Sequence, residues 1–160
     1  GPLPDSTLMA RKLGGNPRGL CASPDYLKRK GIPKTPGDLD RHDCIGMEAM
    51  PVWYFKGSDG AEIAYQLEKP PITGDSGDFA YDATIHGLGL SVKSIAHVWE
   101  DLRDGNLVEV MTDFPVARVG AIWAVYPPGK YVPPKISAFV DFLKSKYGKP
   151  PYWETDYRLA

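Results

Sequence analysis

The hydrophobic and polar positions of this sequence follow helical spacing most clearly near its C-terminal end. Apolar residues recur there every three or four positions, which places them on one face of a helix. Lys144 and Lys146 fall in the last turn, where cations are favourable, and Gly148 follows as a stop signal. The pattern therefore predicts a helix with one apolar stripe, formed by Ile136, Phe139, Val140, Leu143 and Tyr147.

Two helices are predicted in the middle of the chain. Asp75 or Ser76 can cap a helix over residues 77–86, which ends at Gly87. Ser94 can cap a second helix that closes at Gly105. Its apolar positions follow the i, i+3, i+4, i+7 spacing of one helix face and are Ile95, Val98, Trp99 and Leu102.

Shorter helices are indicated nearer the N-terminus. Ser23 is a good N-cap and Pro24 a good first helical residue, so a helix is expected from Asp25 to Lys30, with Gly31 as its end. The same signals recur a few residues later as a capping-box pattern formed by Thr35, Pro36 and Asp38.

Strands are predicted where apolar residues alternate or form short runs. Val52–Phe55 and Ala61–Leu67 flank the turn signal Ser58-Asp59-Gly60, which indicates a hairpin. Further strands are expected over residues 87–92, 107–111 and 119–126. Strands that alternate with helices indicate an α/β fold class.

Composition and charge narrow the function. The chain has 160 residues, of which 42% are hydrophobic and 24% charged, as in ordinary globular proteins. The formal net charge is -1, whereas a module that reads duplex DNA carries a basic face. We therefore expect no DNA binding by this stretch alone. No apolar run reaches the roughly 20 residues that span a bilayer, so no membrane contact is expected.

The residues that commonly bind metals give no metal or cofactor signal. Cys21 and Cys44 have no CxxC pairing, and they are expected to be reduced, largely buried thiols, as in a cytoplasmic protein. His42, His86 and His97 are not spaced as ligands on one element. No cofactor and no metal are therefore expected.

Gly74–Asp78 resembles the glycine-flanked serine of trypsin-like proteases. That chemistry needs a histidine base beside the serine, and the only upstream histidine, His42, precedes Ser76 by just 34 residues. Asp78 also stands where that motif has a glycine. The chain is therefore not expected to be an enzyme, and a helix start is the better interpretation. Free N–H groups at such a start can hold an anion.

The chain as a whole resembles the effector-binding region of LysR-type bacterial transcriptional regulators. The likeness covers nearly all of the sequence, in order and with natural spacing. The stretches that carry it are Leu8–Gly14, Pro17–Leu27, Pro33–Cys44, Ala83–Leu90, Asp104–Val108, Ile122–Pro127 and Pro133–Leu143.

The resemblance implies a type 2 periplasmic-binding-protein-like fold, with two α/β lobes joined by crossover strands. Leu20–Ala22 and Ala121–Tyr126 would be those strands. Residues 1–21 would then be the remainder of lobe one with the first crossover strand, and residues 22–118 lobe two. Residues 119–160 would be the return strand and the last helix on lobe one, which is incomplete in this chain. A periplasmic solute-binding protein of the same fold is the alternative.

The resemblance also implies a small-molecule effector between the lobes. Its contacts would come from the junction Gly74–Phe79 and from the start of the chain, which gives the candidate ligand-binding residues Asp75, Ser76, Gly77, Asp78, Phe79, Pro2 and Leu3. Two carboxylates there would disfavour a dianion. The family further implies cytoplasmic location, dimers or tetramers of the full-length protein, and DNA binding through an N-terminal helix-turn-helix that this stretch lacks. Self-association is expected for the chain itself.

Overall fold

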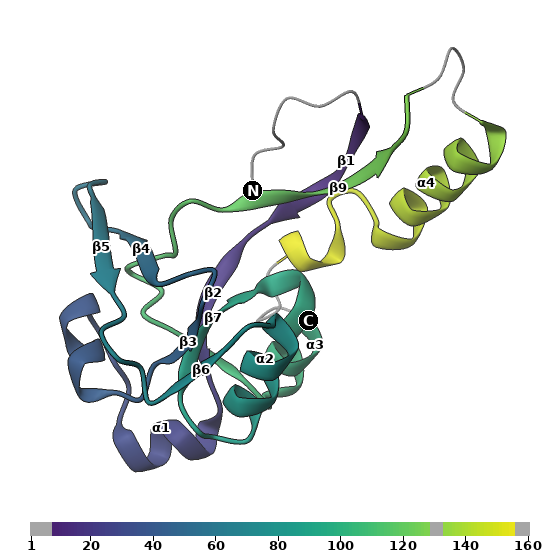
Figure 1. The fold of residues 1–160 in the computed structure, drawn as a ribbon. Helices are drawn as coiled ribbons and strands as arrows, with labels where there is room; N and C mark the ends of the chain where they lie inside the picture. Colours follow the sequence, from purple (N-terminus) through teal and green to yellow (C-terminus); the bar gives the residue numbers. More distant parts are fainter. Residues whose placement is uncertain (1–7, 129–132, 156–160) are drawn as a thin grey trace.

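The computed structural model describes residues 8–128 and 133–155 (Figure 1). It contains nine strands, four α-helices and two 3₁₀ helices in that described part. In chain order the elements are β1 (Met9–Asn16), β2 (Arg18–Ala22), α1 (Pro24–Lys30), η1 (Pro36–Arg41), β3 (Ile45–Met47), β4 (Val52–Lys56), β5 (Glu62–Gln66), β6 (Ile72–Gly74), α2 (Gly77–Ile85), β7 (Leu90–Ser94), α3 (Ile95–Asp104), β8 (Val108–Val110), β9 (Gly120–Tyr126), α4 (Pro134–Tyr147) and η2 (Tyr152–Glu154).

Strand β2 lies in the middle of the central sheet. It pairs antiparallel with β7 on one side and with β8 on the other. Strands β3 and β6 pair in parallel, and an isolated parallel bridge between Cys44 and Leu90 brings β3 beside β7. This approach requires Gly89, because a side chain there would clash with the carbonyl oxygen of Asp43. We call residues 18–118, which contain this sheet and its covering elements, the body.

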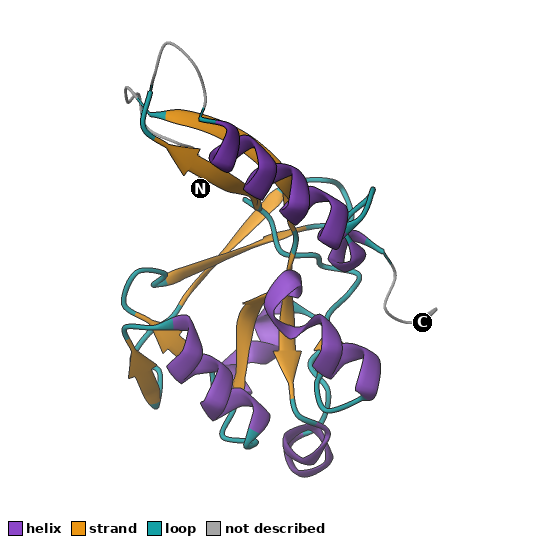
Figure 2. Cartoon of the chain, turned by 90° about the vertical axis from the view of Figure 1, so that its right-hand side faces the viewer, coloured by secondary structure: helices purple, strands orange, loops and turns teal. Residues whose placement is uncertain are grey.

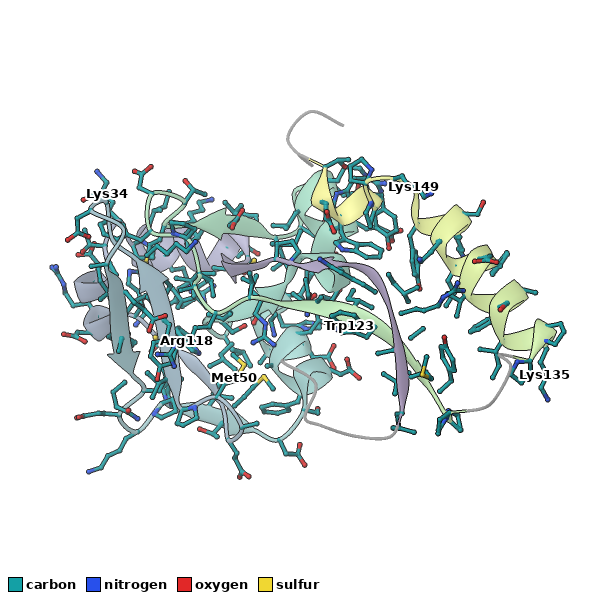
Figure 3. All side chains as sticks on the ribbon, turned by 90° about the horizontal axis from the view of Figure 1, so that it is seen from above. Lys34, Met50, Arg118, Trp123, Lys135 and Lys149 are labelled. Carbon is teal, nitrogen blue, oxygen red and sulfur yellow. The ribbon has the colours of Figure 1, made fainter. Side chains whose placement is uncertain are left out.

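Strands β1 and β9 form a separate antiparallel ribbon that leads out of the body and back. Helix α4 lies along this ribbon, as Figure 2 shows. An ion pair of 3.7 Å between Arg11 on β1 and Asp141 on α4 joins the two. We call β1, β9 and α4 together the arm. Figure 3 shows Trp123 on β9 and the two ends of α4, marked by Lys135 and Lys149.

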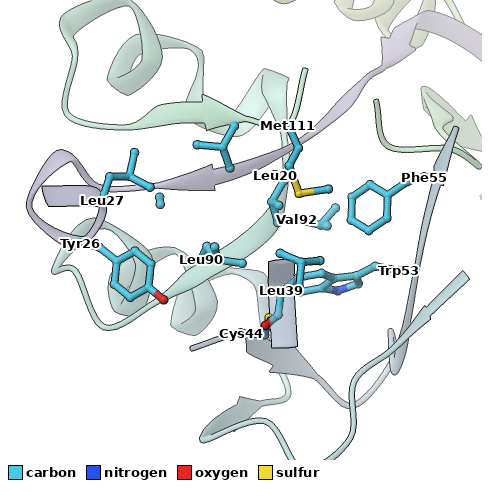
Figure 4. Packing of buried hydrophobic residues seen from close by; sticks show 12 residues of the cluster. Leu20, Tyr26, Leu27, Leu39, Cys44, Trp53, Phe55, Leu90, Val92 and Met111 are labelled. Carbon is cyan, nitrogen blue, oxygen red and sulfur yellow. The ribbon is translucent and has the colours of Figure 1, made fainter. Parts of the chain in front are cut away.

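The two faces of the body's sheet carry different hydrophobic cores. Successive side chains of a strand point to opposite faces, so Leu20 and Ala22 enter one core while Cys21 enters the other. On the first face the sheet is covered by α1, η1 and the β4–β5 hairpin (Figure 4), with Tyr26, Leu39, Trp53 and Phe55 fully or almost fully buried. On the second face it is covered by α2 and α3, with Ile95, Val98 and Leu102 buried around Cys21.

The C-terminal turn η2 fastens the arm to the body. Trp153 is buried in the core beneath α3. Its indole Nε1–H donates to the carbonyl oxygen of Gly15 at 2.9 Å, and the Gly15 N–H donates to the carboxylate of Glu154. Both backbone groups of Gly15 are therefore bonded to η2, at the point where β1 leaves the ribbon for the body.

The predicted helix starts and the hairpin are confirmed. Tyr26 N–H donates to the Ser23 hydroxyl at 3.3 Å, as expected of an N-cap. The Asp38 carboxylate accepts from the N–H of Thr35 at 2.9 Å, which is the acidic half of the capping box. Strands β4 and β5 pair antiparallel as the expected hairpin, with Ile63 and Tyr65 packed against the body's core. Cys21 and Cys44 are free and buried, as predicted.

Two expectations differ from the structure. Ser94 stands at the N-cap of α3, but its hydroxyl donates to Asn16 and makes no capping bond. The predicted strand 87–92 begins only at Leu90, because Gly87 adopts a turn with φ 74°. The return strand β9 pairs with β1, and Leu20–Ala22 lies in β2 of the body's sheet.

Candidate ligand-binding site

The carboxyl ends of β3 and β6 meet at one edge of the body's sheet. Met47 and Gly74 are paired at these ends, and the N–H of Glu48 donates to the carbonyl oxygen of Gly74 at 3.2 Å. In open α/β sheets, ligands bind beyond the carboxyl ends of strands, where helices begin. Helix α2 starts at this edge immediately after β6. The predicted junction Gly74–Phe79 therefore lies where the fold class places ligands.

The start of α2 is built by Ser76 and Phe79. The N–H of Phe79 donates to the Ser76 hydroxyl at 3.2 Å, so Ser76 rather than Asp75 is the N-cap. One side of the Phe79 ring lies on Gly74, since any side chain at position 74 would clash with it. The ring is still 42% exposed. The N–H groups of Gly77 and Asp78 belong to the first turn, whose donors a helix cannot satisfy internally.

Asp75, Ser76, Gly77 and Asp78 are all exposed at this start. Asp78 lies 3.9 Å from His97 Nε2 on α3, and the His97 ring stacks on Tyr81. No histidine is hydrogen-bonded to Ser76 in the described part of the chain, so the serine has no base. The other two predicted ligand contacts, Pro2 and Leu3, lie outside the described residues.

A cavity of about 320 Å³ opens at the same edge. The turn from Met47 to Met50 connects the cavity to the end of β3, where Met47 pairs with Gly74. A 2.8 Å hydrogen bond from the Met50 N–H to the Met47 carbonyl oxygen closes this turn. Figure 3 shows Met50 and Arg118 close together beside the hairpin. The cavity is lined by Arg18, Ala49, Met50, Pro51, Val52, Trp53, Tyr54, Val92, Val116, Ala117 and Arg118.

The two arginines of this cavity have different surroundings. Arg118 forms a two-pronged ion pair with Glu62, with Nη2 to Oε1 at 2.6 Å and Nε to Oε2 at 3.0 Å. Its guanidinium also lies 3.4 Å from the ring centre of Tyr54. Arg18 is half-buried, and its guanidinium contacts the thioether sulfur of Met50. In residues 8–128 and 133–155 no carboxylate forms an ion pair with Arg18.

Sequence reasoning found the helix start but missed the cavity. Arg18, Met50, Val92 and Arg118 come from four distant segments, and no local pattern singles out any of them. The strand pairing brings them together, because Arg18 lies opposite Ser94 at the open end of β2.

A second cavity, of about 450 Å³, lies between η1 and β5. Several of its polar side chains are already hydrogen-bonded within the protein. The Tyr65 hydroxyl donates to Asp40 at 3.1 Å, and His42 Nδ1 lies 3.2 Å from the Tyr26 hydroxyl. Burial raises the pKa of the Cys44 thiol to about 12, so it is not a nucleophile at neutral pH. The described residues contain no cluster of three side chains suited to a metal, and none of their helices could cross a membrane.

This mixed α/β architecture, in which a helix begins at the carboxyl ends of the strands, is the type 2 periplasmic-binding-protein-like fold, as predicted. The family model of the LysR substrate binding domain matches residues 1–148. The chain therefore belongs to the LysR substrate-binding-domain family, which confirms the resemblance seen in the sequence.

The relatives are transcriptional regulators, and the periplasmic alternative is not favoured. The chain is 28% identical to the HTH-type transcriptional regulator DmlR of Escherichia coli over 146 residues, which is 89% of this chain and 46% of DmlR. Among solved structures it is similar to the CrgA regulatory domain of Neisseria meningitidis, with a TM-score of 0.80 and 28% identity over 92% of this chain and 72% of that one. Full-length AphB of Vibrio cholerae gives a TM-score of 0.76 at 26% identity, over 89% of this chain and 49% of AphB.

The chain thus spans about half the length of the full-length regulators that it matches. The matched part lies within the regulatory domain, of which the chain covers 72% in CrgA.

Proposed function

We propose that this chain is the part of a LysR-type regulator that senses a small-molecule effector at the carboxyl edge of the body's sheet. The observation that carries the proposal is the exposed helix start after β6, with a cavity beside the turn that follows its partner strand β3. Ser76, Gly77 and the exposed face of Phe79 supply hydroxyl, backbone and ring contacts. Asp75, Asp78, Pro2 and Leu3 complete the proposed set of ligand contacts.

The division into lobes belongs to the same proposal. Residues 22–118, which make up most of the body, are lobe two. The ribbon β1–β9 connects it to lobe one, to which residues 1–21 and 119–160 contribute. An effector acts only by binding two conformations with different affinity. The ribbon is the element whose angle to the body distinguishes those conformations, and η2 holds that angle through Gly15.

The rest of the regulator supplies the output. A helix-turn-helix outside this chain binds DNA, and the full-length protein is a dimer or tetramer in the cytoplasm without enzymatic activity. The net charge of -1 agrees with this, because phosphate contacts need a basic surface.

Self-association of this chain follows from its uncovered apolar side chains. Phe139 and Phe142 on α4 are 61% and 58% exposed, and Val125 on β9 is exposed as well. Adjacent apolar side chains of this size mark surfaces that associate. Sedimentation velocity should show an average mass that rises with concentration. A monodisperse monomer at high concentration would contradict this.

The sensing proposal is tested by ligand screening on the 160-residue chain. A thermal-shift screen of organic acids, amino acids and small aromatic compounds should give at least one stabilising compound. Phe79→Ala should weaken its binding about tenfold, since the compound loses the exposed ring at the helix start. The matched control is Phe139→Ala, which removes an exposed ring from the arm, away from the helix start. Equal weakening by both variants, or by neither, would count against the site.

A further inference from the structure

We propose that the cavity binds an organic monoanion, one carboxylate on a small apolar body, with Arg18 as the residue that holds the carboxylate. The inference rests on the proposed effector-sensing function and names the class of ligand that the site takes. It stands on the cavity, on the surroundings of Arg18 and on the charges of the lining.

The guanidinium of Arg18 lacks an anionic partner in the described part of the chain. Its recorded contact is the thioether sulfur of Met50, which is a weak acceptor. A half-buried guanidinium loses hydration, and an uncompensated loss costs free energy. A carboxylate that enters the cavity compensates for the lost hydration by accepting two parallel N–H···O bonds, a geometry that suits a guanidinium.

The charges around the cavity leave one position for an anion. Among the described residues of the lining, Arg18 and Arg118 are the only charged ones, and none is an aspartate or glutamate. Glu62 already neutralises Arg118 by its two-pronged pair. The lining therefore carries one uncompensated positive charge, at Arg18. A neutral ligand would leave the charge of Arg18 uncompensated, and a dianion would bring one negative charge more than Arg18 can compensate.

The remaining surface of the cavity fits an apolar body. Met50, Trp53, Val92 and Val116 line it together with alanine and proline side chains. A volume of about 320 Å³ lies at the lower end of small-molecule sites, which run from about 300 to 1,000 Å³. A second carboxylate in the cavity would find no further cationic group free of an ion pair among the described lining residues, because Arg118 is paired with Glu62. The arrangement thus selects one negative charge.

The experiment follows the Met50 methyl group of the 160-residue chain by NMR. The methionine methyl groups are labelled with carbon-13, and Met50→Leu assigns the signal. Butyrate, benzoate and 3-phenylpropionate are titrated at pH 7 and constant ionic strength, each beside its neutral amide. We expect the carboxylates to shift the Met50 signal saturably, and each amide to bind at least tenfold more weakly. The dianion terephthalate should bind more weakly than benzoate.

Arg18→Gln should lower the affinity for the carboxylates at least tenfold and remove the preference over the amides. Arg18→Lys keeps the charge without the two-pronged geometry, so it should retain part of that preference. Arg41→Gln is the matched control, because Arg41 is an exposed arginine outside the cavity, and it should change nothing. Thermal unfolding of each variant shows whether it is folded, and Arg18→Lys keeps the test valid if Arg18→Gln is not.

The outcomes separate this inference from the function on which it rests. Amides that bind as well as the acids overturn the monoanion while keeping the cavity as a ligand site. No shift of Met50 with any carboxylate overturns the cavity as the binding place. In that case a screening compound that depends on Phe79 would leave the effector-sensing function standing at the helix start alone.

Discussion

The body and the arm of this protein differ in how far they bury phenylalanine side chains. In the body, Phe55 on β4 is fully buried among residues of the sheet and the hairpin. In the arm, Phe139 and Phe142 on α4 are more than half exposed, and Val140 is the one buried residue of the helix. Both regions have regular secondary structure. Only the body encloses its apolar residues within the described chain.

The comparison shows that an apolar stripe defines a helix without deciding what covers it. Helix α4 begins with Pro134 at its first position and ends at Gly148, whose φ of 91° suits glycine. These local signals fix its length. Burial of its stripe requires a second surface, and the ribbon β1–β9 covers only part of it, since Trp123 and Val125 on β9 are themselves exposed.

The largest expected effect separates the two regions by one chemical change. Phe55→Ala should lower the free energy of unfolding by about 3–5 kcal/mol, because it leaves a cavity in the body's core. Phe139→Ala should change it by less than about 0.5 kcal/mol, as expected at an exposed site. Urea unfolding of both variants measures the difference. Equal losses would mean that the arm is packed as tightly as the body.

A smaller effect of opposite sign concerns Lys93 on β7. The residue is 4% exposed, and its Nζ has no hydrogen-bond partner in the described part of the chain. Burial lowers the pKa of Lys93 from 10.5 to about 8. Below pH 8 both the folded and unfolded states carry the proton, so folding buries a charge. Lys93→Met should therefore raise the free energy of unfolding by about 1–3 kcal/mol at pH 7.

The pH dependence gives this prediction its sign. Between about pH 8 and 10.5 the folded state releases the proton while the unfolded state keeps it, so the stability contribution of Lys93 rises with pH. The extra stability of Lys93→Met over the natural chain should be fully present below pH 8. It should decrease as the pH rises from 8 to 10.5. Lys28→Met, at an exposed lysine of α1, is the control. A pH-independent difference between the two proteins would refute the interpretation.

The smallest effect tests the fastening between the two regions. Trp153→Phe keeps an aromatic ring in the core but removes the indole N–H that bonds to Gly15. It should lower the free energy of unfolding by about 1 kcal/mol and speed hydrogen exchange of β1 amides. Trp123→Phe on the exposed face of β9 is the matched control and should change neither. Unchanged exchange in Trp153→Phe would show that η2 does not hold the ribbon.

Much of the fold could be predicted from the sequence, because caps and spacing act over a few residues. The starts at Ser23, Thr35 and Ser76, and the β4–β5 hairpin, depend on neighbours in the chain. The prediction for Ser94 was only half right. Its hydroxyl found Asn16, 78 residues away in sequence, and a partner at that separation leaves no local pattern.

The candidate site divides in the same way. The helix start at Gly74–Phe79 was predicted because a cap and a glycine mark it, together with the resemblance to LysR-type regulators. The cavity was not, since Arg18, Met50, Val92 and Arg118 meet only through strand pairing and the return of the chain toward β9.

The sequence by itself thus determined the elements, the α/β class, the family and the helix start of the site. Each of these is encoded in residues close in the chain or in an ordered set of short motifs. The tertiary structure decided which face of each element is covered, where the charge of Lys93 is buried, and which arginine of the cavity lacks a partner. Those properties depend on distances between atoms far apart in sequence, and only the folded chain sets those distances.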